Sequence, residues 1–170
     1  SEFLLYVWVE VKGLKVYECK VGMTTEKYET RKMKQRLSKF FRQGDLAGAK
    51  AYFLGVLEKR PDVLMEASDI TGELKLAMQV IAVCELEQQE YGESVLDRIR
   101  NFEDLMHYFN GINEAVNACK TGRIGEQEIR FLKENRVSEI AIEASARLFT
   151  VGEKELAGVT GALFPVIAEN

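Results

Sequence analysis

The spacing of apolar residues changes near Thr25, and this change strongly limits what the chain can fold into. After Thr25, apolar side chains recur about every 3.6 residues, the period of an α-helix with one buried side. Only 2 of the 170 residues are proline, below the usual ~5%, so long helices can form without interruption. We therefore expect a mainly α fold, a helical array or bundle of about seven helices.

The first 24 residues follow a different pattern. Every second residue from Leu5 to Val11 is Leu or Val, the period of a β-strand, and Lys12-Gly13 offers a turn before a second apolar run starts at Leu14. A lone hairpin is marginally stable in water. We therefore expect a β-hairpin over residues 1–24 that packs on a helical domain over residues 25–170, with a single domain overall.

Glycines and capping residues divide the helical part. Gly44 is expected to end the first helix and Asp45 to cap the second, while the third starts at Asp62 or Asp69 and lies centrally in the core. We expect the second helix to bury one set of apolar residues: Leu46, Ala49, Phe53, Val56 and Leu57. Residues 94–100 are expected to be helical, and Asn101 to start a further helix whose apolar period runs from Phe102 to Val116. Two more helices are expected over 126–134 and 138–149. The apolar tail from Glu155 is compatible with a frayed helix or with a segment that packs on a neighbour.

Positive charge is concentrated in the first third of the chain. Residues 1–60 hold 13 basic and 7 acidic residues (net +6), whereas residues 61–170 hold 10 and 20 (net −10), for a total of −4. The densest part lies on the first predicted helix. A basic helix side can bind an anionic partner, for which nucleic acid is the usual candidate, or can be a solvated side next to acidic helices. The candidate binding residues are Lys27, Arg31, Lys34 and Arg36.

Several kinds of catalytic and metal site are excluded by composition. One histidine and three cysteines cannot build a multi-histidine centre or a four-cysteine zinc site, and no Gly-rich phosphate loop is present. We expect no metal, no cofactor and no catalytic residue. His107 follows Glu103 by one helical turn, and we expect it to be a surface or half-buried side chain.

Cysteine usage and hydropathy indicate a compartment. Cys19, Cys84 and Cys119 form no CxxC pair, which suits a reducing environment. The apolar run from Phe3 to Val9 is far shorter than the ~20 residues of a membrane span, and the start lacks the basic and small-residue features of a signal peptide. We expect a cytoplasmic protein with no membrane contact.

The stretch from Lys39 to Pro61 resembles the second half of a tetratricopeptide repeat. Gly44-Asp45 stands at the turn, Ala49 is the small residue between helices, and Phe53 and Leu57 follow at helical spacing. The similarity covers about one degenerate repeat, residues 33–61. It implies a helical hairpin and a scaffold that binds other proteins or supports a neighbouring domain.

A second resemblance is to the opening of GIY-YIG endonucleases. It rests on Tyr6-Val7-Trp8, then Lys20 to Thr24, then an arginine-bearing helix. It implies metal-dependent phosphodiester cleavage with Tyr6, Tyr17, Arg31 or Arg36, and Glu73 in the catalytic roles.

We therefore expect a non-catalytic helical interaction or accessory module with a protein partner or neighbouring domain. The alternative is a nucleic-acid-binding protein, or a GIY-YIG-like nuclease, that uses the basic first helix.

Overall fold

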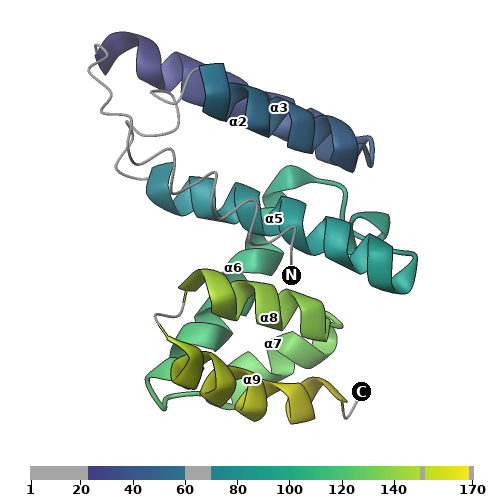
Figure 1. Ribbon diagram of the computed structural model, residues 1–170, viewed down its shortest axis with the longest axis vertical. Coiled ribbons are helices and arrows are strands. Elements are labelled where there is room, and N and C mark those ends of the chain that lie inside the picture. The colour runs from purple at the N-terminus through teal and green to yellow at the C-terminus, as the bar shows by residue number, and fades with distance from the viewer. Residues whose placement is uncertain (1–22, 60–69, 150–151, 169–170) are drawn as a thin grey trace. The chain divides into compact units, whose positions relative to one another are not determined.

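A computed structural model describes residues 23–59, 70–149 and 152–168. Seven α-helices and one short 3₁₀ helix make up these ranges, with no strand among them, which confirms the mainly α prediction (Figure 1). The predicted hairpin over residues 1–24 lies outside the described residues, apart from the start of the first helix at Met23. The chain divides into two compact units, Ser1–Leu105 and Met106–Asn170, which we call the first and second unit.

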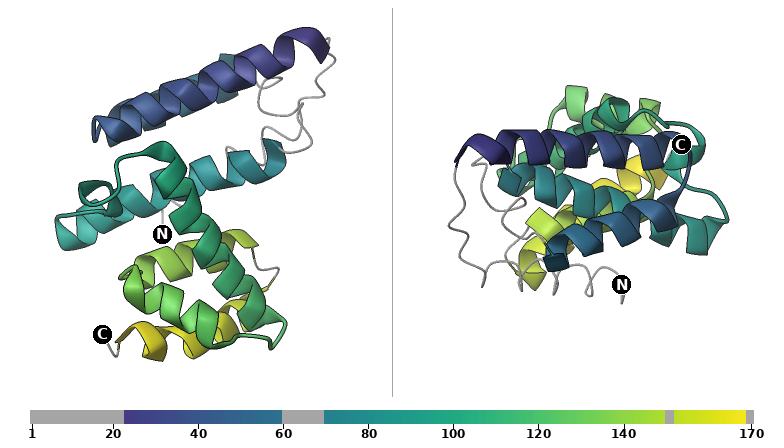
Figure 2. Two further views of the ribbon diagram at one scale, coloured as in Figure 1. Left: turned by 180° about the vertical axis from the view of Figure 1, so that it is seen from behind. Right: turned by 90° about the horizontal axis from the view of Figure 1, so that it is seen from above.

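The first unit opens with a hairpin of two helices, α2 (Met23–Arg42) and α3 (Leu46–Lys59) (Figure 2). Gly44 takes a φ of 69°, a conformation that favours glycine, and the Asp45 amide donates to the Phe40 carbonyl at 2.9 Å. The Asp45 carboxylate then accepts from the Gly48 amide at 2.8 Å and caps α3. Both the predicted stop and the predicted cap are confirmed.

The two hairpin helices pack through side chains that the helical period predicts. Met33, Leu37 and Phe41 are buried on α2, and Ala49 and Phe53 on α3. The rings of Phe40 and Tyr52 lie 5.9 Å apart at the edge of this contact. The small side chain of Ala49 lets the helices approach closely, which matches its predicted role.

Helix α5 (Ile70–Tyr91) is the central helix of the first unit. Every residue from Leu76 to Cys84 is buried, including Gln79, so the prediction of a core helix is confirmed. Gly92, with a φ of 72°, ends it.

The segment after α5 differs from the prediction. Only Val95–Asp97 form a short 3₁₀ helix, η1, so the expected helix over residues 94–100 is wrong. The Ser94 side chain accepts a hydrogen bond from the Asp97 amide, and the Asp97 carboxylate accepts one from the Ser94 amide, which forms a capping box. This local pairing replaces a longer helix. Helix α6 (Phe102–Lys120) follows, capped by the Asn101 side chain. The Phe102 ring stacks on Phe41 with centroids 5.6 Å apart.

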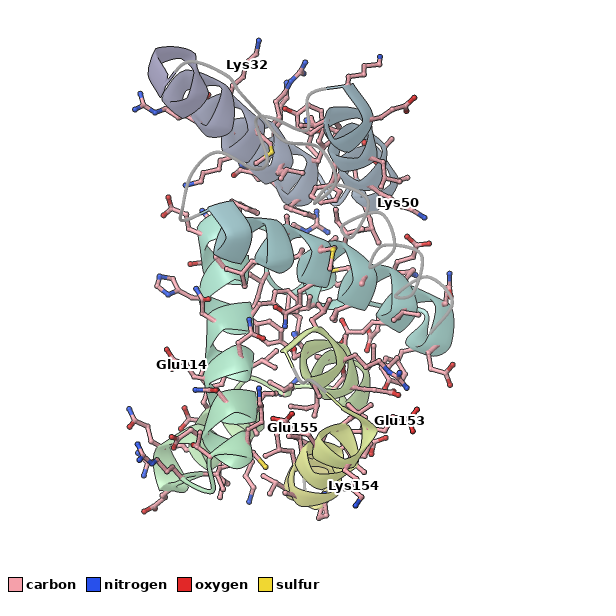
Figure 3. The ribbon with its side chains drawn as sticks, turned by 60° about the vertical axis from the view of Figure 1, so that its left-hand side comes forward. Lys32, Lys50, Glu114, Glu153, Lys154 and Glu155 are labelled. Atoms are coloured by element: carbon pink, nitrogen blue, oxygen red, sulfur yellow. The ribbon has the colours of Figure 1, made fainter. Side chains whose placement is uncertain are left out.

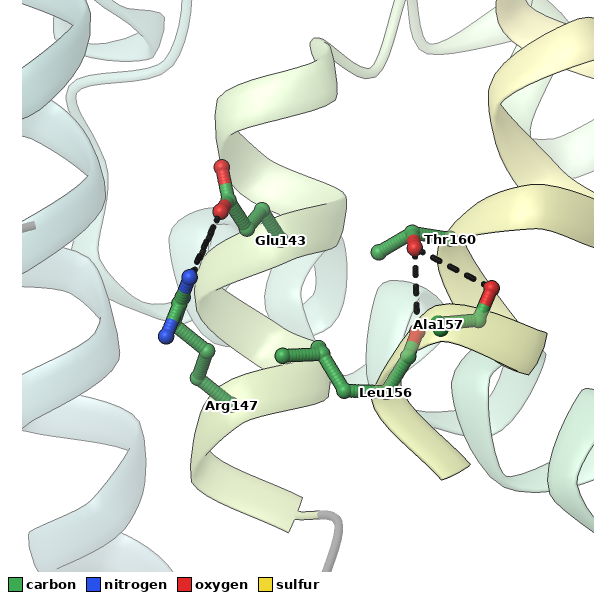
Figure 4. Close-up of polar contacts among 5 residues, drawn as sticks. All are labelled: Glu143, Arg147, Leu156, Ala157 and Thr160. Carbon is green, nitrogen blue, oxygen red and sulfur yellow. Dashed lines mark hydrogen bonds and ion pairs between the residues drawn. The ribbon is translucent and has the colours of Figure 1, made fainter. Parts of the chain in front are cut away.

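The second unit holds most of α6 together with α7 (Glu126–Glu134), α8 (Glu139–Phe149) and α9 (Glu153–Ala168). The tail that the sequence left open is a helix: α9 packs on α8 and α7 and buries Val159, Leu163 and Ile167. Lys120 pairs with Glu155 at 3.4 Å and ties the end of α6 to the start of α9. Within α9 the Thr160 hydroxyl donates to the Leu156 and Ala157 carbonyls (Figure 4).

Candidate interaction surfaces

One side of α2 carries a row of exposed cations. Its members project from the side opposite Met33, Leu37 and Phe41, as Figure 3 shows for Lys32. We call this row the basic stripe; it consists of Arg31, Lys32, Arg36, Lys39 and Arg42. Among the described residues, none of the five forms an ion pair with a carboxylate. The stripe therefore presents its charge to solvent.

The predicted binding residues divide between the stripe and its surroundings. Arg31 and Arg36 belong to the stripe, and the Arg36 guanidinium lies 5.7 Å from the centre of the Tyr52 ring, which helps to hold it in place. Lys34 is half-buried on the packed side of α2 and interacts within the chain. Lys27 lies on α2, but its side chain is outside the described residues. Lys32, Lys39 and Arg42 share the exposed side with the two arginines.

An open groove of about 700 Å³ lies between α3 and α5. Four of its eight lining residues are Ala or Leu, all from α3. The lining comprises Leu46, Ala47, Lys50, Ala51 and Leu54 from α3 and Glu85, Gln88 and Gln89 from α5. The Leu57 side chain lies outside the described residues, and Leu46 and Val56 are only half-buried, so the assignment of these two to the core was wrong. The reason is that α3 is apolar on two sides, of which the helical packing of the first unit covers one.

A polar pair crosses this groove. The Lys50 ammonium lies 3.4 Å from the Glu85 carboxylate, and both side chains are partly shielded from solvent (Figure 3 labels Lys50). Gln88 and Gln89 are exposed at the α5 edge. The groove thus has a mostly apolar wall on α3 and a polar edge on α5. Sequence reasoning missed it, although Ala47, Ala51 and Leu54 lie at helical spacing on the second apolar side of α3.

A buried polar cluster holds η1 against α5. The Glu87 carboxylate accepts from the Val95 amide at 3.0 Å and is nearly inaccessible to solvent. Burial, and then the Glu87 charge, raise the pKa of the Cys84 thiol well above its usual value. Cys84 is therefore an unreactive buried thiol.

The second unit has a polar groove of about 330 Å³ between α6 and α7. His107 lies at this groove and is exposed, as predicted, and Phe131 closes over Gly111. In the ranges that the structure describes, no group of three or more His, Cys, Asp and Glu side chains is arranged to hold a metal ion.

The residues of the nuclease resemblance are not brought together by the described structure. Tyr6 and Tyr17 lie outside the described residues. Glu73 lies on α5, with a side chain that is also outside them, and Arg31 is exposed on α2. This catalytic set stays a prediction.

Comparison with known proteins adds no relative. No family model matches the chain, and neither the curated proteins nor the solved structures contain a significant match. Within residues 23–59, 70–149 and 152–168, no helix combines the length and apolar content that crossing a bilayer requires.

Proposed function

We propose that the chain is a non-catalytic helical interaction module that binds a helix of a partner protein, or of a neighbouring domain, in the α3–α5 groove. The observation that carries this proposal is the wall of α3. Leu46 and Leu54 are half-buried there, and Ala47 and Ala51 are exposed beside them. Covering these side chains removes apolar surface from water, which favours association.

The lining favours a helix as the bound element. Ala47 and Ala51 are one helical turn apart, so a partner backbone can approach α3 closely there. Leu46 and Leu54 flank the two alanines as ridges. An amphipathic helix would place its apolar row against the alanines and its polar side near Gln88 and Gln89.

The resemblance to a tetratricopeptide repeat supports the same proposal. The resemblance rests on Gly44-Asp45, which form the turn between α2 and α3, and on Ala49 and Phe53, which are buried on α3. Helices in such repeats pack on neighbouring helices, and the side of a hairpin helix that no neighbour covers is a surface on which another helix can stack.

A photo-crosslinking amino acid at Ala51 tests the proposal in cells that make the full chain. We expect a crosslink to a helix of another polypeptide, and we expect the purified pair to bind directly. Leu54→Glu should then weaken that binding about tenfold or more, because it places a charge in the apolar contact.

The matched control is Leu156→Glu, which makes the same change at a half-buried leucine of α9 and should leave the affinity unchanged. Circular dichroism should show both variants folded. Crosslinks confined to the same chain, or equal losses in the two variants, would contradict the proposal.

A further inference from the structure

Several cations of the basic stripe lie one helical turn apart. Lys32 and Arg36 are spaced i, i+4, while Arg36 with Lys39, and Lys39 with Arg42, are spaced i, i+3. Like charges at these spacings destabilise a helix by roughly 0.2–0.5 kcal/mol per pair. A polyanion bound along α2 would turn this repulsion into attraction.

We propose that the basic stripe binds the phosphate backbone of a nucleic acid. The stripe runs over eleven helical steps from Arg31 to Arg42, about 16 Å at 1.5 Å per residue. One strand of duplex DNA carries a phosphate about every 3.4 Å along the axis, so about five phosphates fit beside the stripe. Five cations therefore face about five phosphates. Three of the five are arginines, whose planar guanidinium groups match phosphate geometry.

A membrane surface fits the stripe less well. Helices that bind in the plane of a membrane insert an apolar side below the headgroups. The apolar side of α2 is already committed, because Met33, Leu37 and Phe41 are buried inside the first unit.

An acidic protein surface also fits less well. Protein interfaces obtain most of their affinity from a few buried apolar or aromatic anchors, and exposed charges at the edge contribute little. The stripe has no such anchor, because the one large hydrophobic side chain that is exposed among the described residues is Tyr91, on α5. Nucleic-acid binding needs no anchor, since the release of counterions from phosphates drives it.

The binding experiment uses the full chain and a fluorescently labelled DNA duplex of about 20 base pairs, with anisotropy measured between about 50 and 200 mM salt. If five phosphates are contacted, the slope of log affinity against log salt should be about −4.5, at ~0.9 per phosphate. The triple variant Lys32→Gln, Arg36→Gln, Lys39→Gln should reduce the slope to about −1.8 and the affinity at low salt by about tenfold or more.

The matched control removes three exposed cations from the second unit, with Arg123→Gln, Arg136→Gln and Lys154→Gln. This control variant changes the net charge by the same amount as the stripe variant and should leave the slope of log affinity against log salt unchanged. Equal losses in the two triple variants, or no binding at the lowest salt, would overturn the proposal. Tighter binding to polyglutamate or to vesicles containing phosphatidylserine would also overturn it and assign the stripe to an acidic protein or a membrane. The stripe shares no residue with the α3–α5 groove, so the two proposals fail separately.

Discussion

Exposed charges are arranged in opposite ways on α2 and on the helices of the second unit. In the second unit, Arg147 lies 3.0 Å from Glu143 and Arg130 lies 3.5 Å from Glu126, each pair one turn apart on one helix (Figure 4 shows Glu143 with Arg147). On α2, cations stand next to cations. The paired helices use their charges for their own stability, whereas among the described residues the five stripe cations of α2 form no such pair.

Two helical glycines differ in how tightly they are packed. A Cβ on Gly55 of α3 would meet nothing within 4 Å, whereas a Cβ on Gly111 of α6 would collide with the Phe131 ring. Gly55 can therefore be replaced by a larger residue, whereas the contact with Phe131 requires glycine at Gly111. The same residue type therefore has opposite structural meaning at these two positions.

The largest expected effect comes from a core substitution that tests whether the two units unfold separately. Phe53→Ala should destabilise the first unit by about 3–5 kcal/mol, because it removes a fully buried ring and leaves a cavity. Cys84 reports on the first unit and Cys119 on the second. Iodoacetamide labelling, read by peptide mass spectrometry, should show Cys84 reacting at least ~100-fold faster, since about 1.4 kcal/mol corresponds to a factor of ten.

The labelling of Cys119 should stay unchanged in that variant. The converse control is Leu163→Ala in α9, with an expected cost of about 2–5 kcal/mol, which should leave the labelling of the buried Cys84 unchanged. Faster labelling of Cys84 in Leu163→Ala would show that the two units unfold together.

A smaller effect is expected at the two glycines. Gly111→Ala should lower the free energy of unfolding by about 1–3 kcal/mol through overpacking against Phe131. Gly55→Ala should raise it by about 0.5–1 kcal/mol, because alanine favours a helix and nothing obstructs it. Urea unfolding followed by circular dichroism measures both.

Removing the obstructing ring gives the control. In a Phe131→Ala background, Gly111→Ala should become stabilising by the same ~0.5–1 kcal/mol. If Gly111→Ala remains destabilising there, the Phe131 contact does not explain the glycine.

The smallest expected effects come from changing single exposed charges on α2 and α8. Gln35 is exposed among the stripe residues and is one turn from Arg31, Lys32 and Lys39. Gln35→Glu should therefore stabilise α2 by about 0.5 kcal/mol and also weaken DNA binding. Glu143→Gln should instead destabilise α8 by about 0.3–0.5 kcal/mol, because it removes the ion pair with Arg147. Thermal unfolding at low and high salt measures both, and the effects should shrink as salt screens them. Changes of the same sign in the two variants would contradict the comparison.

The interaction surfaces could be predicted only in part from the sequence. The basic character of α2 follows from the residues and their period, and so does the exposure of Arg31 and Arg36. The half-buried position of Lys34 does not follow, because it lies at the margin between the two sides of the helix, where packing decides. The groove was missed because the apolar period of α3 does not say which of its two apolar sides meets a neighbour.

The helical class and most helix ends follow from the amino-acid sequence. These depend on local terms: the apolar period, the glycine at Gly44, the caps at Asp45 and Asn101, and the near absence of proline. Only the packing of the folded chain shows that the C-terminal tail is a packed helix and that Leu46 and Leu54 line a groove. The physical reason is that a periodic pattern records which side of a helix avoids water, whereas the neighbour that covers that side is set by contacts between residues far apart in the chain.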